Sequence, residues 1–368
     1  MPAPVRNQVK IVICGLAITS SWGNGHATTY RSLARALHAR GHEIVFLERD
    51  LEWYASNRDM PEPPFCQVFL YDDWREILPS LRRELGDADV AMVGSYFPDG
   101  IEAIACVLDS GVAIKAFYDI DTPITVGKLR SGDAEYLRRD QIRGFDLYFS
   151  FTGGPMLEEL ITKFHARCPV PLYCSFDPDR YRLSAAESRF HCDLSYMGTY
   201  AADRQTKLEE LLCQPARQLP ELRFLVAGPQ YPESILWPAN VGRIIHLEPK
   251  FHPPFYCSSR MTLNLTRREM VETGYSPSVR LFEAAGCGAT IITDTWPGLE
   301  TLFVPEREIL LADTGDQVIR YLRDINPDDA RAMGRAAQER VMAEHTAEKR
   351  AVEFENYVGA KTFAKQCA

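Results

Sequence analysis

The sequence predicts an α/β protein made of two doubly wound, Rossmann-like parallel-sheet domains. Short apolar runs alternate with amphipathic helical segments along most of the 368 residues, which is typical of parallel sheets covered by helices on both faces. A polar stretch at residues 177–189 interrupts the alternation, which then starts again. At roughly 100–200 residues per domain, the length also agrees with two domains.

The first domain is predicted to alternate strands and helices from residue 10 onward. Its first helix, at residues 26–40, has apolar side chains on one face and ends at Gly41. Strands are predicted at residues 10–14, 43–47, 66–70, 90–93, 113–118, 147–151 and 170–174, with further helices at residues 74–85, 101–108 and 156–164.

The second domain repeats this pattern after the polar stretch. Strands are predicted at residues 194–197, 224–227, 243–246, 261–265 and 290–293, and helices at residues 204–212, from Ser276 onward and within 327–358. We therefore expect an N-terminal domain at residues 1–175, a C-terminal domain at residues 176–345 and a final helix at residues 346–368.

Composition excludes several classes of protein. With 46% apolar and 25% charged residues, the chain is expected to be globular. A net charge of −9 argues against a general nucleic-acid binder, because phosphate contacts dominate such binding. The ten cysteines form no Cys-x-x-Cys pair, so we expect reduced thiols in a cytoplasmic protein, without a zinc site. Residues 1–10 are polar and no apolar run approaches about 18 residues, so neither a signal peptide nor a membrane span is predicted.

Residues 274–288 (GYSPSVRLFEAAGCG) carry the most informative motif. They predict a loop, a short helix and a tight turn before a buried strand, with Ser276 as the N-cap and Pro277 at the first helical position. The first N–H groups of such a helix, including that of Ser278, attract a phosphate. Arg280 and Glu283 would share one helix face, where they suit a diphosphate and a ribose diol. The alternative is an ordinary surface helix, but the following buried strand favours a nucleotide-diphosphate pocket.

This motif, together with Asp294 and Gly298-Leu299-Glu300, resembles the C-terminal half of GT-B glycosyltransferases. More narrowly, it is similar to the CgeB-like (spore-maturation-type) group, which is related to the retaining glycosyltransferase family 4. The resemblance implies two domains facing across a cleft, a C-terminal helix that returns to the first domain, and a nucleotide-sugar donor. Glu283 matches the ribose-binding second Glu of that family's Glu-(seven residues)-Glu pattern, and Tyr275 stands where the first Glu would be.

Two groups in the first domain are candidates for acceptor chemistry. The loop at residues 20–25 lacks a full Gly-x-Gly-x-x-Gly pattern, so it does not predict a dinucleotide site. By resemblance, Gly25 and His26 would face the acceptor, with His26 as a general base; the alternative is a loop contact. Asp119 and Asp121 follow a strand and could share a divalent metal, although a metal-independent, cleft-lining role is the favoured interpretation, with Asp121 catalytic.

Other candidates in the second domain surround its predicted strand ends. Gly198 begins a loop after a strand, and Arg204 lies early on the next helix, where it could reach the diphosphate or be solvated. Tyr231 could stack on the nucleobase or cover the core. Arg267 or its neighbour could add positive charge, and Asp294 could touch the sugar or cap a turn.

Together these features predict a cytoplasmic, metal-independent glycosyltransferase that needs no cofactor. It would move a sugar from a small-molecule donor, a UDP-, GDP- or dTDP-linked sugar, to an unknown acceptor that is not a nucleic acid, with retention of configuration. The alternatives are a sugar-nucleotide 2-epimerase, which would act on the donor alone, and a non-catalytic nucleotide-binding or coat-associated protein.

Overall fold

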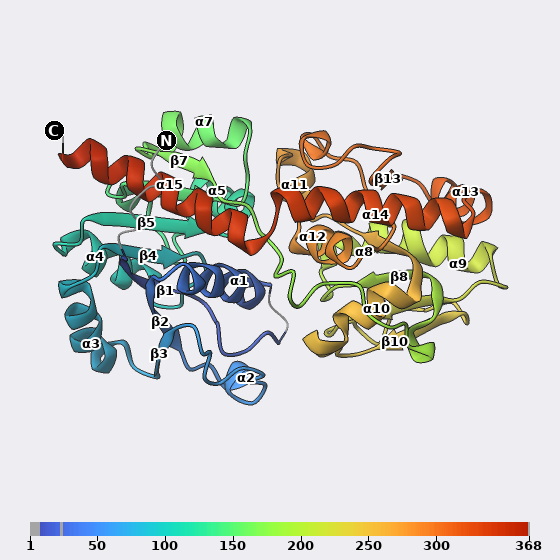
Figure 1. The fold of residues 1–368 in the computed structure, drawn as a ribbon, viewed down its shortest axis with the longest axis horizontal. Helices are drawn as coiled ribbons and strands as arrows, with labels where there is room; N and C mark the ends of the chain where they lie inside the picture. The colour runs from blue at the N-terminus through green and yellow to red at the C-terminus, as the bar shows by residue number, and fades with distance from the viewer. Residues whose placement is uncertain (1–7, 23–24, 367–368) are drawn as a thin grey trace. The chain divides into compact units, whose positions relative to one another are not determined.

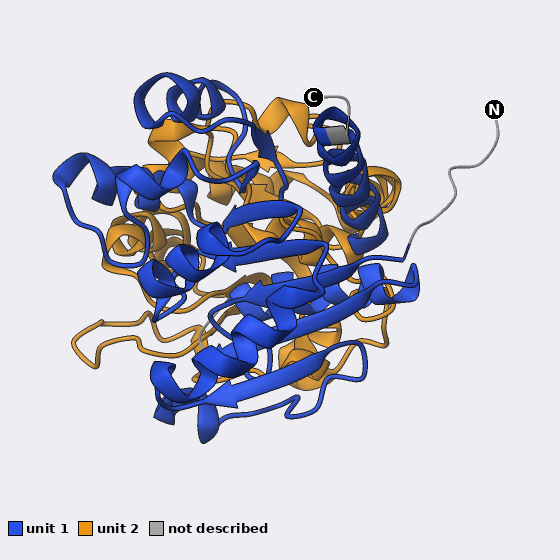
Figure 2. Cartoon of the chain, turned by 90° about the vertical axis from the view of Figure 1, so that its left-hand side faces the viewer, with its two compact units in different colours: residues 1–173, 347–368 blue, residues 174–346 orange. Residues whose placement is uncertain are grey.

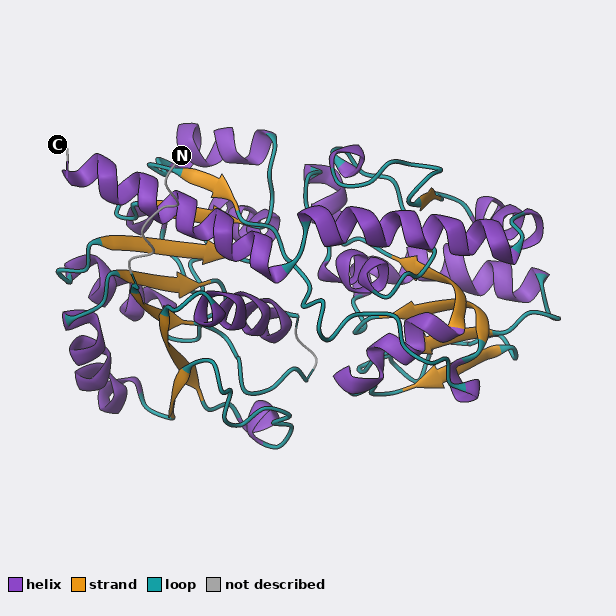
Figure 3. Cartoon of the chain, viewed as in Figure 1, coloured by secondary structure: helices purple, strands orange, loops and turns teal. Residues whose placement is uncertain are grey.

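The computed structural model describes residues 8–22 and 25–366 and divides into two compact units. Unit 1 contains residues 1–173 and 347–368, and unit 2 contains residues 174–346 (Figure 2). In each unit the strands lie together with helices packed around them (Figure 3). No helix in the described part of the chain combines the length and apolar character that spanning a bilayer requires.

Unit 1 is built on a seven-stranded parallel sheet within the described residues. Its spatial order is β3 (Gln67–Tyr71), β2 (Glu43–Arg49), β1 (Lys10–Cys14), β4 (Val90–Gly94), β5 (Ile114–Asp119), β6 (Leu147–Ser150) and β7 (Pro169–Pro171). The strand order reverses between β1 and β4. In open α/β sheets, ligands bind beside the carboxyl ends of the strands at such a switch point.

The helices of unit 1 include the last helix of the chain. They are α1 (His26–Ala39), α2 (Glu52–Ala55), α3 (Trp74–Gly86), α4 (Gly100–Asp109), α5 (Thr122–Ser131), α6 (Arg139–Ile142), α7 (Pro155–Phe164) and α15 (Ala347–Gln366). The α15 helix packs against α1 and β5 (Figure 1). Glu355 of α15 accepts hydrogen bonds from Arg40 Nε at 2.5 Å and Nη2 at 2.6 Å, and lies 2.9 Å from His42 Nε2.

Unit 2 has a six-stranded parallel sheet in the described residues, with a second switch point. The order is β10 (Val241–Ile244), β9 (Phe224–Ala227), β8 (Cys192–Met197), β11 (Ser259–Asn264), β12 (Ile291–Thr293) and β13 (Leu310–Leu311), so the order reverses between β8 and β11. Its α-helices are α8 (Ala202–Leu208), α9 (Gln214–Gln218), α10 (His252–Ser258), α11 (Arg268–Thr273), α12 (Val279–Gly286), α13 (Gly315–Asp324) and α14 (Pro327–Glu344). Single-turn 3₁₀ segments lie at Ser188–Phe190, Pro249–Phe251 and Leu299–Thr301.

The structure confirms the predicted fold class and changes some element boundaries. The helix predicted at residues 204–212 extends through α9, with a π-helical turn at Glu209–Cys213 between α8 and α9. Pro215 explains this turn, because proline has no N–H and its ring clashes with the carbonyl one turn earlier. The strand expected at residues 243–246 begins two residues earlier, at Val241. The sequence analysis did not predict α5 or α10, both of which contain proline near their start.

Candidate active site

His26 and Asp121 meet at the carboxyl end of the unit 1 sheet. His26 is the first residue of α1, and Asp121 is the N-cap of α5. The imidazole is 8% exposed, and its Nε2 atom lies 2.8 Å from Asp121 Oδ2. The fold thus joins two predicted site residues that are 95 positions apart in the sequence.

This contact determines which nitrogen of His26 is free to act. A carboxylate only accepts hydrogen bonds, so the neutral imidazole carries its hydrogen on Nε2 and a lone pair on Nδ1. Within the described residues, Nδ1 is buried and has no hydrogen-bond partner. Gly25, the N-cap of α1, is exposed and has no side chain to cover the imidazole. Gly23 and Asn24 of the predicted loop lie outside the described residues.

Asp119 occupies a different environment from Asp121. It is fully buried at the end of β5, where it accepts hydrogen bonds from Thr125 Oγ1 at 2.6 Å and from the Tyr148 hydroxyl. Burial raises the pKa of Asp119 to about 7 because desolvation disfavours its charged form, although both hydroxyl groups oppose the shift. No group of three or more His, Cys, Asp or Glu side chains within residues 8–22 and 25–366 is placed to hold a metal.

Tyr96 completes the surroundings of His26 and was not predicted from the sequence. It follows β4, on the other side of the switch point, and its ring stands edge-on to His26 with centroids 5.9 Å apart. Tyr96 has a φ of 59°, a conformation that costs energy for a bulky residue and is found at functional sites. Lys128 Nζ lies 5.2 Å from the Tyr96 ring centroid. The sequence signal was its position just after a buried strand.

The loop before α1 is fastened by two buried charged groups. Glu48, at the end of β2, accepts hydrogen bonds from Ile18 N at 2.6 Å, Thr19 N at 2.9 Å and Thr19 Oγ1 at 2.6 Å. Arg31 of α1 donates to the Ile18 carbonyl at 2.7 Å and binds both oxygens of Asp59. These bonds hold Ile18 and Thr19 against α1 and the end of β2.

In unit 2, Arg280 lies at the switch point between β8 and β11. Its Nε donates to the Met197 carbonyl at the end of β8, and its Nη1 donates to Asn264 Oδ1 at the end of β11, at 2.8 Å. Gly198 leaves room for the guanidinium: a Cβ at this position would lie only 2.8 Å from Arg280 Nη2. A planar cation is therefore held where doubly wound sheets bind anions.

The helix that carries Arg280 begins later than predicted. The expected cap was Ser276 with Pro277 as the first helical residue, but α12 starts at Val279 and its N-cap is Ser278. Gly274 and Tyr275 both have positive φ, which turns the chain before the helix, and Ser276 is buried in that loop. The Ser278 hydroxyl donates to Asn264 Oδ1 at 2.8 Å and does not cap the helix.

Glu283 lies one turn after Arg280, inside unit 2. It is 5% exposed. Burial raises the pKa of Glu283, while the nearby Tyr181 hydroxyl and the charges of Arg180 and Arg280 oppose the increase. The Tyr181 hydroxyl also lies 3.2 Å from His252 Nδ1 of α10.

The remaining candidates of unit 2 make defined contacts. Arg204 Nη2 donates to the Thr199 carbonyl at 2.7 Å, while its buried Nε has no partner among the described residues. The Tyr231 hydroxyl donates to the Gly198 carbonyl at 3.1 Å, and Arg243 lies 4.3 Å from the Tyr231 ring centroid. Arg243 thus covers one face of the Tyr231 ring, so a nucleobase would have to stack on the opposite face. The edge-on neighbour Tyr200, 5.6 Å away, was not predicted.

Arg267 and Asp294 take part in ion pairs within unit 2. Arg267 Nε lies 3.7 Å from Asp203 Oδ2. Asp294 is fully buried: Oδ1 accepts from Thr266 N at 3.1 Å and Thr266 Oγ1 at 2.8 Å, and Oδ2 pairs with Lys207. Both oxygens of Asp294 are thus bound to protein groups that tie together the loops after β11 and β12.

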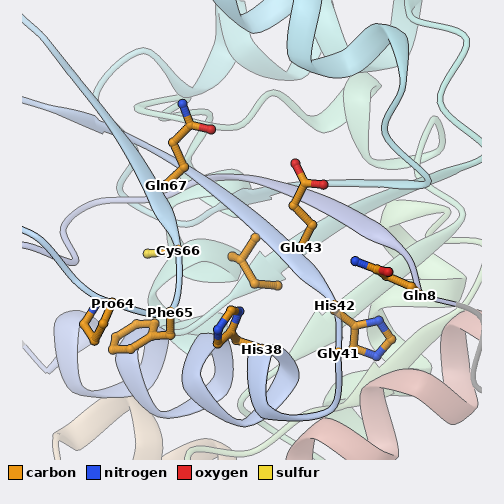
Figure 4. A pocket seen from close by; sticks show the side chains of 10 residues that line it. Gln8, His38, Gly41, His42, Glu43, Pro64, Phe65, Cys66 and Gln67 are labelled. Atoms are coloured by element: carbon orange, nitrogen blue, oxygen red, sulfur yellow. The ribbon is translucent and has the colours of Figure 1, made fainter.

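A cavity of about 490 Å³ lies at the amino ends of strands β2 and β3 in unit 1 (Figure 4). Glu43 and Gln67, the first residues of β2 and β3, line it together with His38, His42 and Cys66. The cavity thus lies at the amino ends of the strands, whereas His26 and Asp121 lie at the carboxyl ends. The cavity is therefore separate from the candidate site.

Comparisons with known proteins concern the fold and part of the sequence. Residues 204–356 match a family model described as glycosyl transferase-like. No curated protein sequence matches the chain. Among solved structures, the sucrose-phosphate synthase of Thermosynechococcus elongatus is similar over 97% of this chain and 100% of that one, with a TM-score of 0.70 and 14% identity.

Two further structures share the fold at similarly low identity. Anabaena HepE, solved with UDP and glucose, matches 96% of this chain and 100% of its own, with a TM-score of 0.68 and 10% identity. An alpha-glucosyltransferase solved with UDP-glucose and DNA matches 96% and 100%, with a TM-score of 0.70 and 11% identity. The chain therefore has the GT-B fold, and within it residues 204–356 match a glycosyl transferase-like family model.

Proposed function

We propose that the protein transfers a sugar from a nucleotide-diphosphate sugar to a hydroxyl group of a small-molecule acceptor. In this proposal unit 2 binds the donor and unit 1 supplies the general base. The observation that carries it is the Arg280 guanidinium, held at the switch point of unit 2 in the first turn of α12. We also propose that the chain belongs to the CgeB-like group, on the strength of the motif around residues 274–300.

For the donor, we propose that Arg280 and the first N–H groups of α12, starting at Ser278, bind the diphosphate. Arg204 would add a second cation through its unpartnered Nε. Glu283 would accept hydrogen bonds from the ribose diol. Similar structures contain UDP and UDP-glucose, so UDP-glucose is the first donor to test, before GDP- and dTDP-sugars.

For the acceptor, we propose that His26 is the general base. The acceptor O–H would give its proton to Nδ1, while Asp121 holds the imidazole tautomer and stabilises the imidazolium that forms. The acceptor oxygen then bonds to the anomeric carbon as the bond from that carbon to the diphosphate oxygen breaks. Arg280 and the α12 N–H groups would stabilise the charge that develops on the leaving diphosphate.

This proposal has a stereochemical consequence. A base that deprotonates the acceptor during a single displacement inverts the anomeric centre, as in glycoside hydrolysis with one base and one acid. The His26–Asp121 contact thus favours inversion, whereas the family 4 resemblance implies retention. The anomeric proton coupling of the product in an NMR spectrum would decide between these outcomes.

Further parts of the proposal concern metal ions and the acceptor class. We propose that the diphosphate is neutralised by Arg280 and the α12 helix, so EDTA should leave the transfer rate unchanged. Although several of the similar alpha-glucosyltransferase structures contain DNA, the net charge of −9 disfavours a nucleic-acid acceptor. Incubation with donor alone separates transfer from epimerisation, because only an epimerase would change the sugar without an acceptor.

The test of the donor site compares Arg280→Met with Arg331→Met. Arg331 is exposed on α14 and forms an ion pair with Asp328, three residues earlier in the same helix. Because a charged hydrogen-bonding group contributes about 1.5–3 kcal/mol, Arg280→Met should weaken UDP binding by at least about tenfold in calorimetry. Arg331→Met should bind like the wild type. Equal UDP affinity of all three proteins would exclude the proposed diphosphate site.

A further inference from the structure

Tyr30 places a hydroxyl group at the switch point of the unit 1 sheet. It lies four residues after His26 on α1, so the two side chains share one face of the helix. Long helical side chains point back toward the start of their helix, and α1 starts with His26. Two glycines leave room for the ring. A Cβ added at Gly94, the last residue of β4, would lie 1.7 Å from the Tyr30 hydroxyl oxygen, and one at Gly15, directly after β1, would lie 2.9 Å from Tyr30 Cζ. The hydroxyl therefore lies where β1 and β4 end.

The Tyr30 hydroxyl has no hydrogen-bond partner in the part of the chain that the structure describes. The residue is 1% exposed, and a buried hydroxyl without a partner is unfavourable for the folded state. By contrast, Tyr71, another buried tyrosine of unit 1, donates its hydroxyl hydrogen to Asp99 Oδ2 at 2.7 Å. Buried polar atoms without partners are rare in folded proteins, so the Tyr30 hydroxyl indicates a function.

A second buried polar atom without a partner among residues 8–22 and 25–366 lies on the same helix face. It is His26 Nδ1, and the ring centroids of His26 and Tyr30 are 6.4 Å apart. Burial raises the pKa of Tyr30, and the nearby Asp121 carboxylate acts in the same direction, so the hydroxyl keeps its hydrogen and donates it. Because Nδ1 has a lone pair, α1 presents one hydrogen-bond donor and one acceptor on the same side.

A donor and an acceptor so placed suit two oxygens of one ligand. One hydroxyl of the ligand donates to His26 Nδ1, while a neighbouring oxygen accepts from Tyr30. A hydrogen bond from Tyr30 to the reacting oxygen itself would withdraw electron density from that oxygen and slow its attack. The two residues therefore favour a ligand with two neighbouring hydroxyl groups over a simple alcohol.

We propose that Tyr30 is a specificity-determining residue of the acceptor site and that the acceptor carries a vicinal diol. This inference rests on the proposed function, in which His26 is the general base. One hydroxyl of the diol would give its proton to His26 Nδ1 while its oxygen bonds to the anomeric carbon, and the bond from that carbon to the diphosphate oxygen breaks. The neighbouring oxygen would accept a hydrogen bond from Tyr30, which keeps its proton throughout.

The first experiment compares the melting temperatures of Tyr30→Phe and Tyr71→Phe in the full-length protein. Each substitution removes one hydroxyl from a buried tyrosine of unit 1, but only that of Tyr71 has a partner to lose among the described residues. We expect Tyr30→Phe to melt at or above the wild-type temperature and Tyr71→Phe to melt about 2–4 °C below it. A loss in Tyr30→Phe as large as that in Tyr71→Phe would overturn the proposal, because the hydroxyl would then be bonded within the fold.

The second experiment measures binding without any donor. Ethylene glycol and propanol are similar in size, but only ethylene glycol carries a second oxygen. Nitrogen NMR follows the His26 imidazole during titration with each alcohol, and His26→Gln assigns its signals. We expect ethylene glycol to shift the Nδ1 signal at concentrations at least about tenfold lower than propanol does. Tyr30→Phe should remove this difference and Tyr71→Phe should keep it.

The third experiment measures transfer from UDP-glucose to the same two alcohols. We expect ethylene glycol to react at least about tenfold faster than propanol, and Tyr30→Phe to slow only the reaction of ethylene glycol. UDP affinity should not change, because Tyr30 lies outside unit 2.

Equal responses of His26 to both alcohols in the wild type, or a preference that survives in Tyr30→Phe, would overturn the proposal. If the NMR preference is found but no donor reacts, the proposed function fails and the diol site of Tyr30 is supported.

Discussion

At the scale of single residues, the candidate chemistry of unit 1 depends on two carboxylates that are two positions apart. Asp121 is partly exposed and bonds His26 Nε2, whereas Asp119 is buried among hydroxyl groups. The sequence predicted both residues as candidates because they follow a strand. It could not separate them, because the direction of each side chain depends on the turn between β5 and α5.

Removing either member of the His26–Asp121 pair should slow transfer. We expect His26→Gln and Asp121→Asn to lower kcat by about 10²–10⁴-fold, the usual contribution of general base catalysis. Donor affinity should not change, because these residues lie outside unit 2. Single-turnover rates and UDP calorimetry would measure the two effects. A variant with wild-type kcat would remove that residue from the mechanism.

A methyl group added at Gly198 should displace the Arg280 guanidinium. A Cβ there would lie 2.7 Å from the Tyr196 hydroxyl and 2.8 Å from Arg280 Nη2, so the guanidinium would have to move. We expect Gly198→Ala to weaken UDP binding by about tenfold, which corresponds to about 1.4 kcal/mol. Gly359→Ala is the matched control, since a Cβ at Gly359 meets nothing within 4 Å. Equal losses in both variants would contradict this explanation.

Asp119 should make stability fall as pH rises. Its folded pKa of about 7 lies above the unfolded value of about 3.9. Between these values the unfolded chain releases the proton that the folded chain keeps, so stability is full below about pH 4 and decreases toward pH 7. Asp119→Asn removes this pH-dependent contribution to the free energy of unfolding. Its melting temperature should exceed that of the wild type at pH 8, with a smaller difference at pH 5; a constant difference would contradict the assignment.

At the scale of elements, the sequence predicted α1 and β5 well and α12 less well. The start of α1 follows from a clear strand–Gly–helix pattern. The start of α12 depends on the positive φ of Tyr275, a backbone conformation that a tyrosine in the sequence does not predict. The α10 helix was missed because Pro253 and Pro254 suggest a loop, although proline is tolerated in the first turn of a helix.

The α15 helix should depend on Glu355 for its attachment within unit 1. Glu355 bonds Arg40 and His42, both largely buried. Glu355→Ala would leave these groups without their acceptor, so we expect unit 1 to lose about 1–3 kcal/mol. Glu348→Ala, at an exposed position of α15, should change little. Hydrogen exchange of α1 and α15 would report the difference, and equal exchange in both variants would contradict it.

At the scale of the whole molecule, the alternation of strands and helices predicted both parallel sheets. It could not reveal Tyr96 or Tyr200, because their positions arise only when separate strand ends are brought to one edge. It also could not show that Asp294 is engaged on both oxygens by Thr266 and Lys207. Such contacts depend on register and loop geometry, which a single sequence does not specify.

Donor binding should stabilise the two units unequally. A ligand that binds only unit 2 stabilises it by about 2.7 kcal/mol at one hundred times its Kd. With UDP present, we therefore expect slower hydrogen exchange in residues 174–346, above all in α12, and smaller changes in unit 1. If hydrogen exchange slowed only in residues 1–173, the nucleotide would bind unit 1, contrary to the proposal.

The position of α15 has a consequence for biosynthesis. Unit 1 is discontinuous in the chain, because its final helix is translated after all of unit 2. On the ribosome, residues 174–346 can emerge and fold while the face of α1 that contacts α15 is still bare. The face of α1 that contacts α15 therefore stays uncovered until α15 has been synthesised, and during that interval it is open to association with other chains.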